Sequence, residues 1–108
     1  MIKIISTGEA YSLYCTEKDN RSFVVLDIRT LEEYKKGHIK GAVQIDYYSD
    51  DFEKEIEKLD RKKIYLVYCR TASRTSAVKD LFEKLGFEDV YIMDQGIIGW
   101  QMKGYPIE

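Results

Sequence analysis

A cysteine lies between an apolar run and a helical pattern in the middle of the chain. Residues 64–68 are all apolar, which is typical of a strand buried on both faces, and apolar residues recur at helical spacing over 77–85. Cys69 is therefore expected at the carboxyl end of a strand and the N-terminus of a helix. Helix amides and the guanidiniums of Arg70 and Arg74 would favour a thiolate there. In such sites a cysteine pKa of about 8.5 can fall to roughly 3.5–7.5, so Cys69 is a candidate nucleophile.

The loop after this cysteine has the composition of an anion site. Its residues are Arg70, Thr71, Ala72, Ser73 and Arg74. Two guanidiniums and the loop amides could orient an anionic substrate by charge-assisted hydrogen bonds. A cysteine nucleophile at this place would act by covalent two-step chemistry. The sequence contains no metal cluster or cofactor motif and the reaction requires none, so we expect neither metal nor cofactor.

Length and composition predict one compact domain over residues 1–108. The chain is 44% hydrophobic, which is enough for one core. Seventeen basic and nineteen acidic residues are scattered and give a net charge of −2, which argues against nucleic-acid and membrane-surface partners. No stretch approaches the ~20 apolar residues of a membrane span, and the start lacks a signal peptide, so we expect a cytoplasmic protein. Cys15 and Cys69 are then expected as separate free thiols, with Cys15 a small core or surface residue.

Strand-like and helix-like segments alternate along the chain. Strands are expected at residues 3–5, 23–28, 43–45, 64–68 and 90–93. Helices are expected over 6–15, where Ser6 and Glu9 have the spacing of a capping box, and over 30–36, 52–59, 77–85 and 97–102. This alternation predicts an α/β fold, a five-stranded and mostly parallel sheet with helices on both faces. Ligands then bind at the carboxyl ends of the strands, where Asp27 and Cys69 both stand.

Three stretches, in order and at the right separations, resemble the rhodanese (sulfurtransferase) superfamily. They are Val25-Leu26-Asp27-Ile28-Arg29 with Glu33-Tyr34 and 37–42, the Cys69 loop, and a closing pattern with Gly96 and Trp100. The resemblance implies a single-domain rhodanese fold in which the loop cysteine, Cys69, takes the electrophilic sulfane sulfur of a donor such as thiosulfate, becomes a persulfide, and passes the sulfur to a nucleophile. The implied donor is thiosulfate, a persulfide or a similar small molecule. The implied acceptor is a thiol, a thioredoxin-like protein or cyanide.

Two other functions stay open at this stage. A cysteine-dependent phosphatase of the dual-specificity type also uses a Cys-to-Arg loop, but with five intervening residues, whereas Cys69 and Arg74 enclose four. The shorter loop suits a sulfur better than a larger phosphoryl group. The second alternative is a non-catalytic rhodanese-like module that binds a partner protein. The cysteine and its two arginines argue against it, because folding alone does not demand them.

Four further residues are assigned to structural support of the site. We expect Asp27 to accept hydrogen bonds from nearby amides, and Arg29 to pair with Glu33 four residues later. The resemblance places His38, the only histidine, in a structural turn. A thiolate activated by amides needs no general base, so His38 is interpreted as structural.

Ala72 and Gln95 stand where many members of the superfamily carry glycine. If residue 72 needed a positive φ, alanine there would be strained or the loop would follow another path. Gln95 raises the same question, to a smaller extent, at the start of the last helix. Trp100 is interpreted as a core or rim aromatic that could line the pocket mouth.

Overall fold

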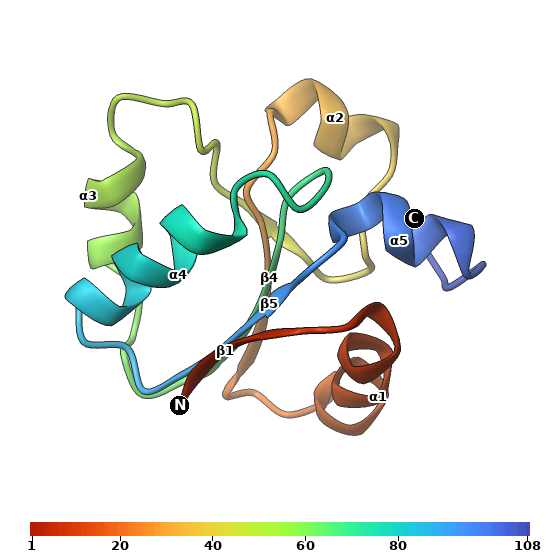
Figure 1. The fold of residues 1–108 in the computed structure, drawn as a ribbon, viewed down its shortest axis with the longest axis horizontal. Helices are drawn as coiled ribbons and strands as arrows, with labels where there is room; N and C mark the ends of the chain where they lie inside the picture. Colours follow the sequence, from red (N-terminus) through yellow and green to blue (C-terminus); the bar gives the residue numbers. More distant parts are fainter.

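The computed structural model describes residues 1–108 and is built around one sheet of five parallel strands (Figure 1). The strands are β1 (Ile2–Ile5), β2 (Phe23–Asp27), β3 (Val43–Gln44), β4 (Ile64–Tyr68) and β5 (Asp89–Met93). Their order in the sheet is β1-β5-β4-β2-β3, and every neighbouring pair is parallel. The α/β fold expected from the sequence is confirmed. β4 lies in the centre of the sheet, which explains its unbroken apolar run.

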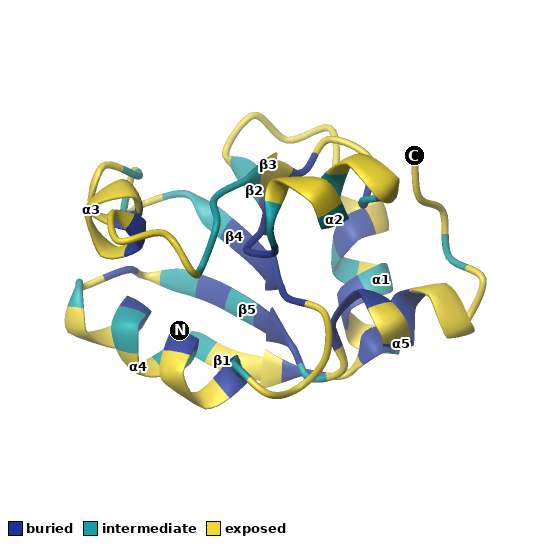
Figure 2. Cartoon of the chain, turned by 90° about the horizontal axis from the view of Figure 1, so that it is seen from above, coloured by how far each residue is buried: buried dark blue, intermediate teal, exposed yellow.

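Five helices cover the two faces of this sheet. They are α1 (Thr7–Glu17), α2 (Leu31–Lys36), α3 (Phe52–Glu57), α4 (Thr75–Lys84) and α5 (Gly96–Met102). Helices α3 and α4 lie on one face, whereas α1 and α5 lie on the other (Figures 1 and 2). None of these helices is long and apolar enough to cross a membrane.

Each face of the sheet has its own hydrophobic core, and β4 contributes to both. Tyr65 and Val67 pack against α3 and α4, whereas Leu66 and Tyr68 pack against α1 and α5, as the two-residue period of a strand requires. Cys69 continues the alternation toward the α3/α4 side. Tyr68, which ends β4, and Cys69, which follows it, therefore face opposite sides of the sheet.

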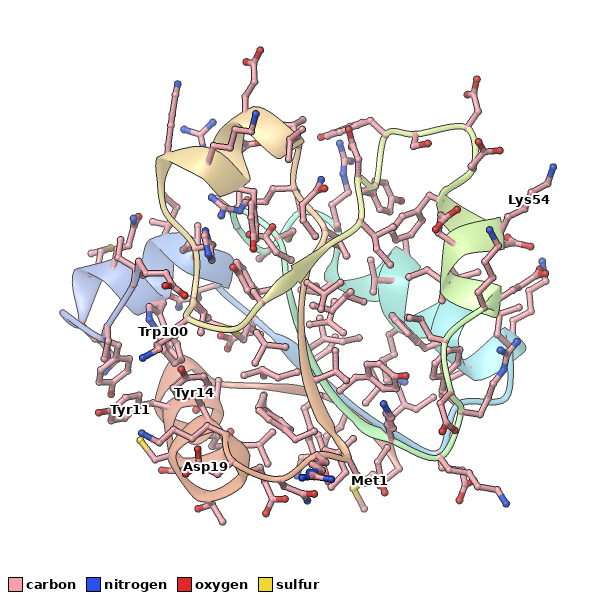
Figure 3. All side chains as sticks on the ribbon, turned by 180° about the vertical axis from the view of Figure 1, so that it is seen from behind. Met1, Tyr11, Tyr14, Asp19, Lys54 and Trp100 are labelled. Carbon is pink, nitrogen blue, oxygen red and sulfur yellow. The ribbon has the colours of Figure 1, made fainter.

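Aromatic rings fill much of the α1/α5 core. Trp100 is fully buried, and its ring centroid lies 5.6 Å from the centroids of both Tyr11 and Tyr14 (Figure 3). The indole N–H of Trp100 donates to the Pro106 carbonyl at 2.8 Å. Trp100 thus belongs to the core and does not line the mouth of a pocket.

Capping signals in the sequence account for the starts of α1 and α2. Ser6 and Glu9 form the expected capping box, with the Glu9 amide donating to Ser6 Oγ at 3.2 Å and the Ser6 amide to Glu9 Oε1 at 3.0 Å. Thr30 and Glu33 form a second capping box at the start of α2. Helix α1 extends to Glu17, two residues beyond the expected end, and α3 ends at Glu57.

Candidate active site

The Cys69 loop lies at the carboxyl edge of the sheet, beside the ends of β2 and β3. The register pairs Asp27 with Tyr68, and the Ile28 amide donates to the Tyr68 carbonyl at 3.0 Å, so β2 ends next to the cysteine. A pocket of about 160 Å³ opens at this edge. It is lined by Ile28, Arg29, Glu33, Tyr47, Tyr48, Cys69, Arg70, Thr71, Ser73 and Arg74.

This pocket unites most of the residues that the sequence singles out. The cysteine and four of the five loop residues line it, together with Arg29 and Glu33 from the β2–α2 region. Ala72, Asp27 and His38 do not line it. No three side chains of His, Cys, Asp or Glu come together as a metal site would require.

The Cys69 thiol is buried at the base of the loop. The residue is 8% exposed, and its thiol donates to the Thr71 carbonyl. Burial raises the pKa of Cys69. Hydrogen bonds from the backbone of Arg74, Thr71 and Cys69 itself, and then the Arg74 charge, act in the opposite direction. The expectation of a lowered pKa is therefore wrong for this resting site, because desolvation outweighs the groups that favour a thiolate.

The start of α5 is hydrogen-bonded to the backbone of the Cys69 loop. The Ile97 amide donates to the Cys69 carbonyl at 2.9 Å, and the Ile98 amide donates to the Arg70 carbonyl at 3.2 Å. Gly96 makes this close approach: its φ is +57°, and a Cβ there would lie 2.6 Å from the Arg70 carbonyl oxygen and collide with that of Cys69. Gly96 is thus needed both for its conformation and for space.

The two departures from the superfamily pattern leave the backbone unstrained. No residue other than glycine has a positive φ, so Ala72 adopts an ordinary conformation in this loop. Gln95 has a φ of −120°, which any residue adopts. The Ala72 carbonyl also accepts from the Thr75 hydroxyl at 3.0 Å, which closes the far end of the loop onto α4.

Arg74 lies at the mouth of the pocket between two tyrosines. Its guanidinium donates to the Tyr48 hydroxyl, and its carbon Cζ is 5.0 Å from the ring centroid of Tyr47 and 4.8 Å from that of Tyr48. No carboxylate forms an ion pair with Arg74. The sequence reasoning missed both tyrosines, although their position just after the strand expected at 43–45 is the signal that places them at this sheet edge.

Arg29 pairs with Asp27 instead of Glu33, so the expected Arg29–Glu33 pair is wrong. Its Nη2 lies 2.6 Å from Asp27 Oδ2 and donates to the Gly37 carbonyl at 2.7 Å. Glu33 is occupied by the α2 capping box. Asp27 accepts the Arg29 amide at 2.9 Å, as expected, and also the Tyr68 hydroxyl at 2.7 Å.

This Asp27–Arg29–Tyr68 network is buried beside the pocket. Asp27 and Tyr68 are fully buried and Arg29 is 7% exposed. Burial, followed by the charge of Asp27, raises the pKa of Tyr68 far above its usual range. The phenol therefore stays a hydrogen-bond donor, and the network fixes the β2–α2 turn beside the pocket.

His38 lies in that turn, outside the pocket. Its Nδ1 is 2.8 Å from the Tyr34 carbonyl oxygen, and its ring stacks on Tyr34 with centroids 3.8 Å apart. Its Nε2 is 3.8 Å from a carboxylate oxygen of Glu108. These contacts connect the turn to the C-terminal segment, and His38 does not line the cysteine pocket.

Comparison with known proteins identifies the family. The family model described as the rhodanese-like domain matches residues 10–103. The chain belongs to the rhodanese-like domain family. The thiosulfate sulfurtransferase GlpE of Coxiella burnetii is 30% identical over 101 residues, which cover 94% of this chain and 89% of that protein.

A second curated relative of this rhodanese-like chain is much longer. The tRNA uridine(34) hydroxylase of Cytophaga hutchinsonii is 38% identical over 84 residues, or 75% of this chain. The matched part covers only 27% of the hydroxylase. This chain thus spans about a quarter of the length of that relative.

Solved structures carry the same fold. The rhodanese-related protein of Thermoplasma volcanium matches with a TM-score of 0.79 and 24% identity, over 98% of this chain and 97% of that one. The rhodanese-like domain of the Alr3790 protein from Anabaena sp. matches with a TM-score of 0.78 and 27% identity, over 100% of this chain and 80% of that one.

Proposed function

We propose that this protein is a sulfurtransferase that moves a sulfane sulfur from a thiosulfate-like donor to a thiol or cyanide through a persulfide on Cys69. The carrying observation is the position of this thiol in a small pocket, under backbone amides and beside the unpaired guanidinium of Arg74. A relative that covers almost the whole chain is named a thiosulfate sulfurtransferase, which supports the same reaction class.

The first half-reaction uses Cys69 as a nucleophile. Its thiolate attacks the outer sulfur of thiosulfate, the sulfur–sulfur bond of the donor breaks, and sulfite leaves with the bonding electron pair. The thiol must first lose its proton to solvent, which its burial disfavours. The amides of Thr71 and Arg74 and the Arg74 charge stabilise the thiolate, and then the persulfide anion in the same place.

Donor binding is assigned to Arg74, which lies at the mouth of the pocket and forms no ion pair. Arg29 also lines the pocket, but Asp27 neutralises it. Arg74 interacts with two tyrosines and has no carboxylate partner. Its remaining N–H groups can therefore bind the oxyanion of the donor by charge-assisted hydrogen bonds. The loop also brings the guanidinium of Arg70 and the hydroxyls of Thr71 and Ser73 to the pocket.

The experiment compares sulfur transfer with phosphate hydrolysis. We expect the protein to convert thiosulfate and cyanide to thiocyanate, Cys69→Ser to abolish this activity, and the matched Cys15→Ser to retain it, because Cys15 is exposed and absent from the pocket. Hydrolysis of p-nitrophenyl phosphate without thiocyanate formation would instead support a phosphatase. Absence of both activities in a folded protein would support the binding module.

A further inference from the structure

A second hollow adjoins the Cys69 pocket, between α2 and α5. It measures about 260 Å³, and we call it the α2–α5 trough. Arg29, Glu33 and Arg70 line both hollows, so a molecule in the trough borders directly on the pocket. Figure 1 shows α2 and α5 on the same side of the molecule, next to the loop between β4 and α4.

The α2–α5 trough has an excess of positive charge in its lining. Arg70 and Lys36 are exposed, and neither forms an ion pair. Arg29 is matched by Asp27. The only carboxylate in the lining belongs to Glu33, and it accepts hydrogen bonds from the Thr30 amide and hydroxyl. Two cations without an ion pair therefore outnumber one carboxylate, and this excess favours an anionic ligand in the trough.

The floor of the trough is apolar and rigidly connected to the loop. Ile97 is buried and Ile98 is 37% exposed. Their amides hold the Cys69 and Arg70 carbonyls, so the floor and the loop form one unit. A ligand here meets a short apolar surface with cations at its rim, at a fixed position relative to the cysteine.

We infer that the α2–α5 trough is the acceptor subsite, and that its ligand is a small thiol that carries carboxylates. This inference rests on the proposed function. It assigns Arg74 to binding of the donor, and Arg70 and Lys36 to binding of the acceptor. A trough of about 260 Å³ suits a molecule of a few residues' size, with its carboxylates on the cations and its sulfur toward Cys69.

The second half-reaction then balances without any further reagent. The acceptor thiolate attacks the outer sulfur of the Cys69 persulfide and forms a new sulfur–sulfur bond. The bond from that sulfur to Cys69 Sγ breaks, its electron pair returns to Cys69, and the acceptor leaves as a persulfide. The proton released by the acceptor thiol is taken up by the Cys69 thiolate or by solvent.

Binding can be tested without turnover, by titrating S-methylglutathione into 15N-labelled protein. This probe has two carboxylates and a blocked sulfur. We expect amide shifts at Lys36, Arg70, Ile98 and Gln101, and binding weakened roughly two- to fivefold in Arg70→Ala and in Lys36→Ala. Lys35→Ala is the matched control, an exposed lysine of α2 outside the trough, and should leave the affinity unchanged. Absence of shifts at these residues, or equal weakening in the control, would overturn the inference.

Turnover distinguishes this inference from the proposed function. The persulfidated protein is mixed with 3-mercaptopropionate, 2-mercaptoethanol or cysteamine, and rates are compared per thiolate. We expect the carboxylate thiol to react fastest, and Arg70→Ala to slow that thiol alone. Equal rates for all three thiols would refute the acceptor subsite and leave the proposed function standing. If no persulfide forms, the proposed function fails, and the titration still decides whether the trough binds anions.

Discussion

Arg29 and Arg74 lie at the same edge of the sheet, in opposite surroundings. Arg29 is buried and held by Asp27 and the Gly37 carbonyl, so its charge is neutralised inside the protein. The Arg74 guanidinium interacts with Tyr47 and Tyr48, and no carboxylate neutralises its charge. Arg29 therefore stabilises the fold, whereas Arg74 is available to bind a ligand. The difference is that a carboxylate pairs with Arg29 and none pairs with Arg74.

Removal of the buried arginine should cause the largest loss of stability. Arg29→Ala leaves the Asp27 carboxylate charged, fully buried and without its ion pair, so we expect a loss of about 3–5 kcal/mol in the free energy of unfolding. Urea denaturation measures this loss. Arg21→Ala, at an exposed arginine without an ion pair, is the matched control and should stay within about 0.5 kcal/mol of wild type. Similar stabilities for both variants would contradict the structural role of Arg29.

Gly96→Ala should have the second largest effect, because Gly96 packs directly against the backbone carbonyls of Cys69 and Arg70. Strain at its positive φ costs about 1–2 kcal/mol, and the collision of the new Cβ with the Cys69 and Arg70 carbonyls adds to this. Gly104→Ala isolates the strain, since Gly104 has a φ of +71° and open space around its Cβ position. We expect Gly96→Ala to lose more stability than Gly104→Ala and to lose sulfur transfer as well. Equal losses in both measurements would show that the close approach is unimportant.

Arg74, which is half-buried and has no ion pair, should show the reverse of Arg29. We expect Arg74→Ala to leave the free energy of unfolding unchanged and to raise KM for thiosulfate by about tenfold, since a charge-assisted contact to the anion is lost. A persulfide donor, which lacks the oxyanion of thiosulfate, should be affected much less, and steady-state kinetics with the two donors make this comparison. Equal losses with both donors would mean that Arg74 acts on the cysteine or on the fold and not on the anion.

The sequence predicts the fold well because its signals there are local. The apolar run of β4 and the Ser6–Glu9 capping box depend on neighbouring residues alone, and both are confirmed. Arg29 could pair with Asp27, two residues earlier, or with Glu33, four residues later. That choice depends on Glu33 being occupied by the α2 cap, which pairwise spacing does not reveal.

The electrostatics of the site are harder to predict, because they depend on packing. Motif spacing shows that cations and amides surround Cys69, but it does not show how deeply the thiol is buried. Burial then reverses the expected direction of the pKa shift. Tyr47 and Tyr48 were missed for a related reason, since only the sheet order brings the segment after β3 next to the Cys69 loop.

The smallest expected effect concerns the pH at which Cys69 reacts. In a Cys15→Ser background, the rate of alkylation by iodoacetamide should have a midpoint above the ordinary cysteine value of about 8.5, because burial raises the pKa. The unfolded chain loses this proton first. The free energy of unfolding therefore falls slightly as pH rises from that value toward the raised pKa of the folded protein. Arg74→Ala should move the midpoint further up, whereas a wild-type midpoint below neutrality would contradict the burial argument.

The most direct test of sulfur transfer is the intact mass of the protein after incubation with thiosulfate and removal of the excess. In the Cys15→Ser background we predict a gain of one sulfur atom, localised to Cys69 and removed by cyanide, and no gain when Cys69 is also replaced by serine. An unchanged mass in a folded protein, or a sulfur attached at another residue, would contradict the persulfide mechanism.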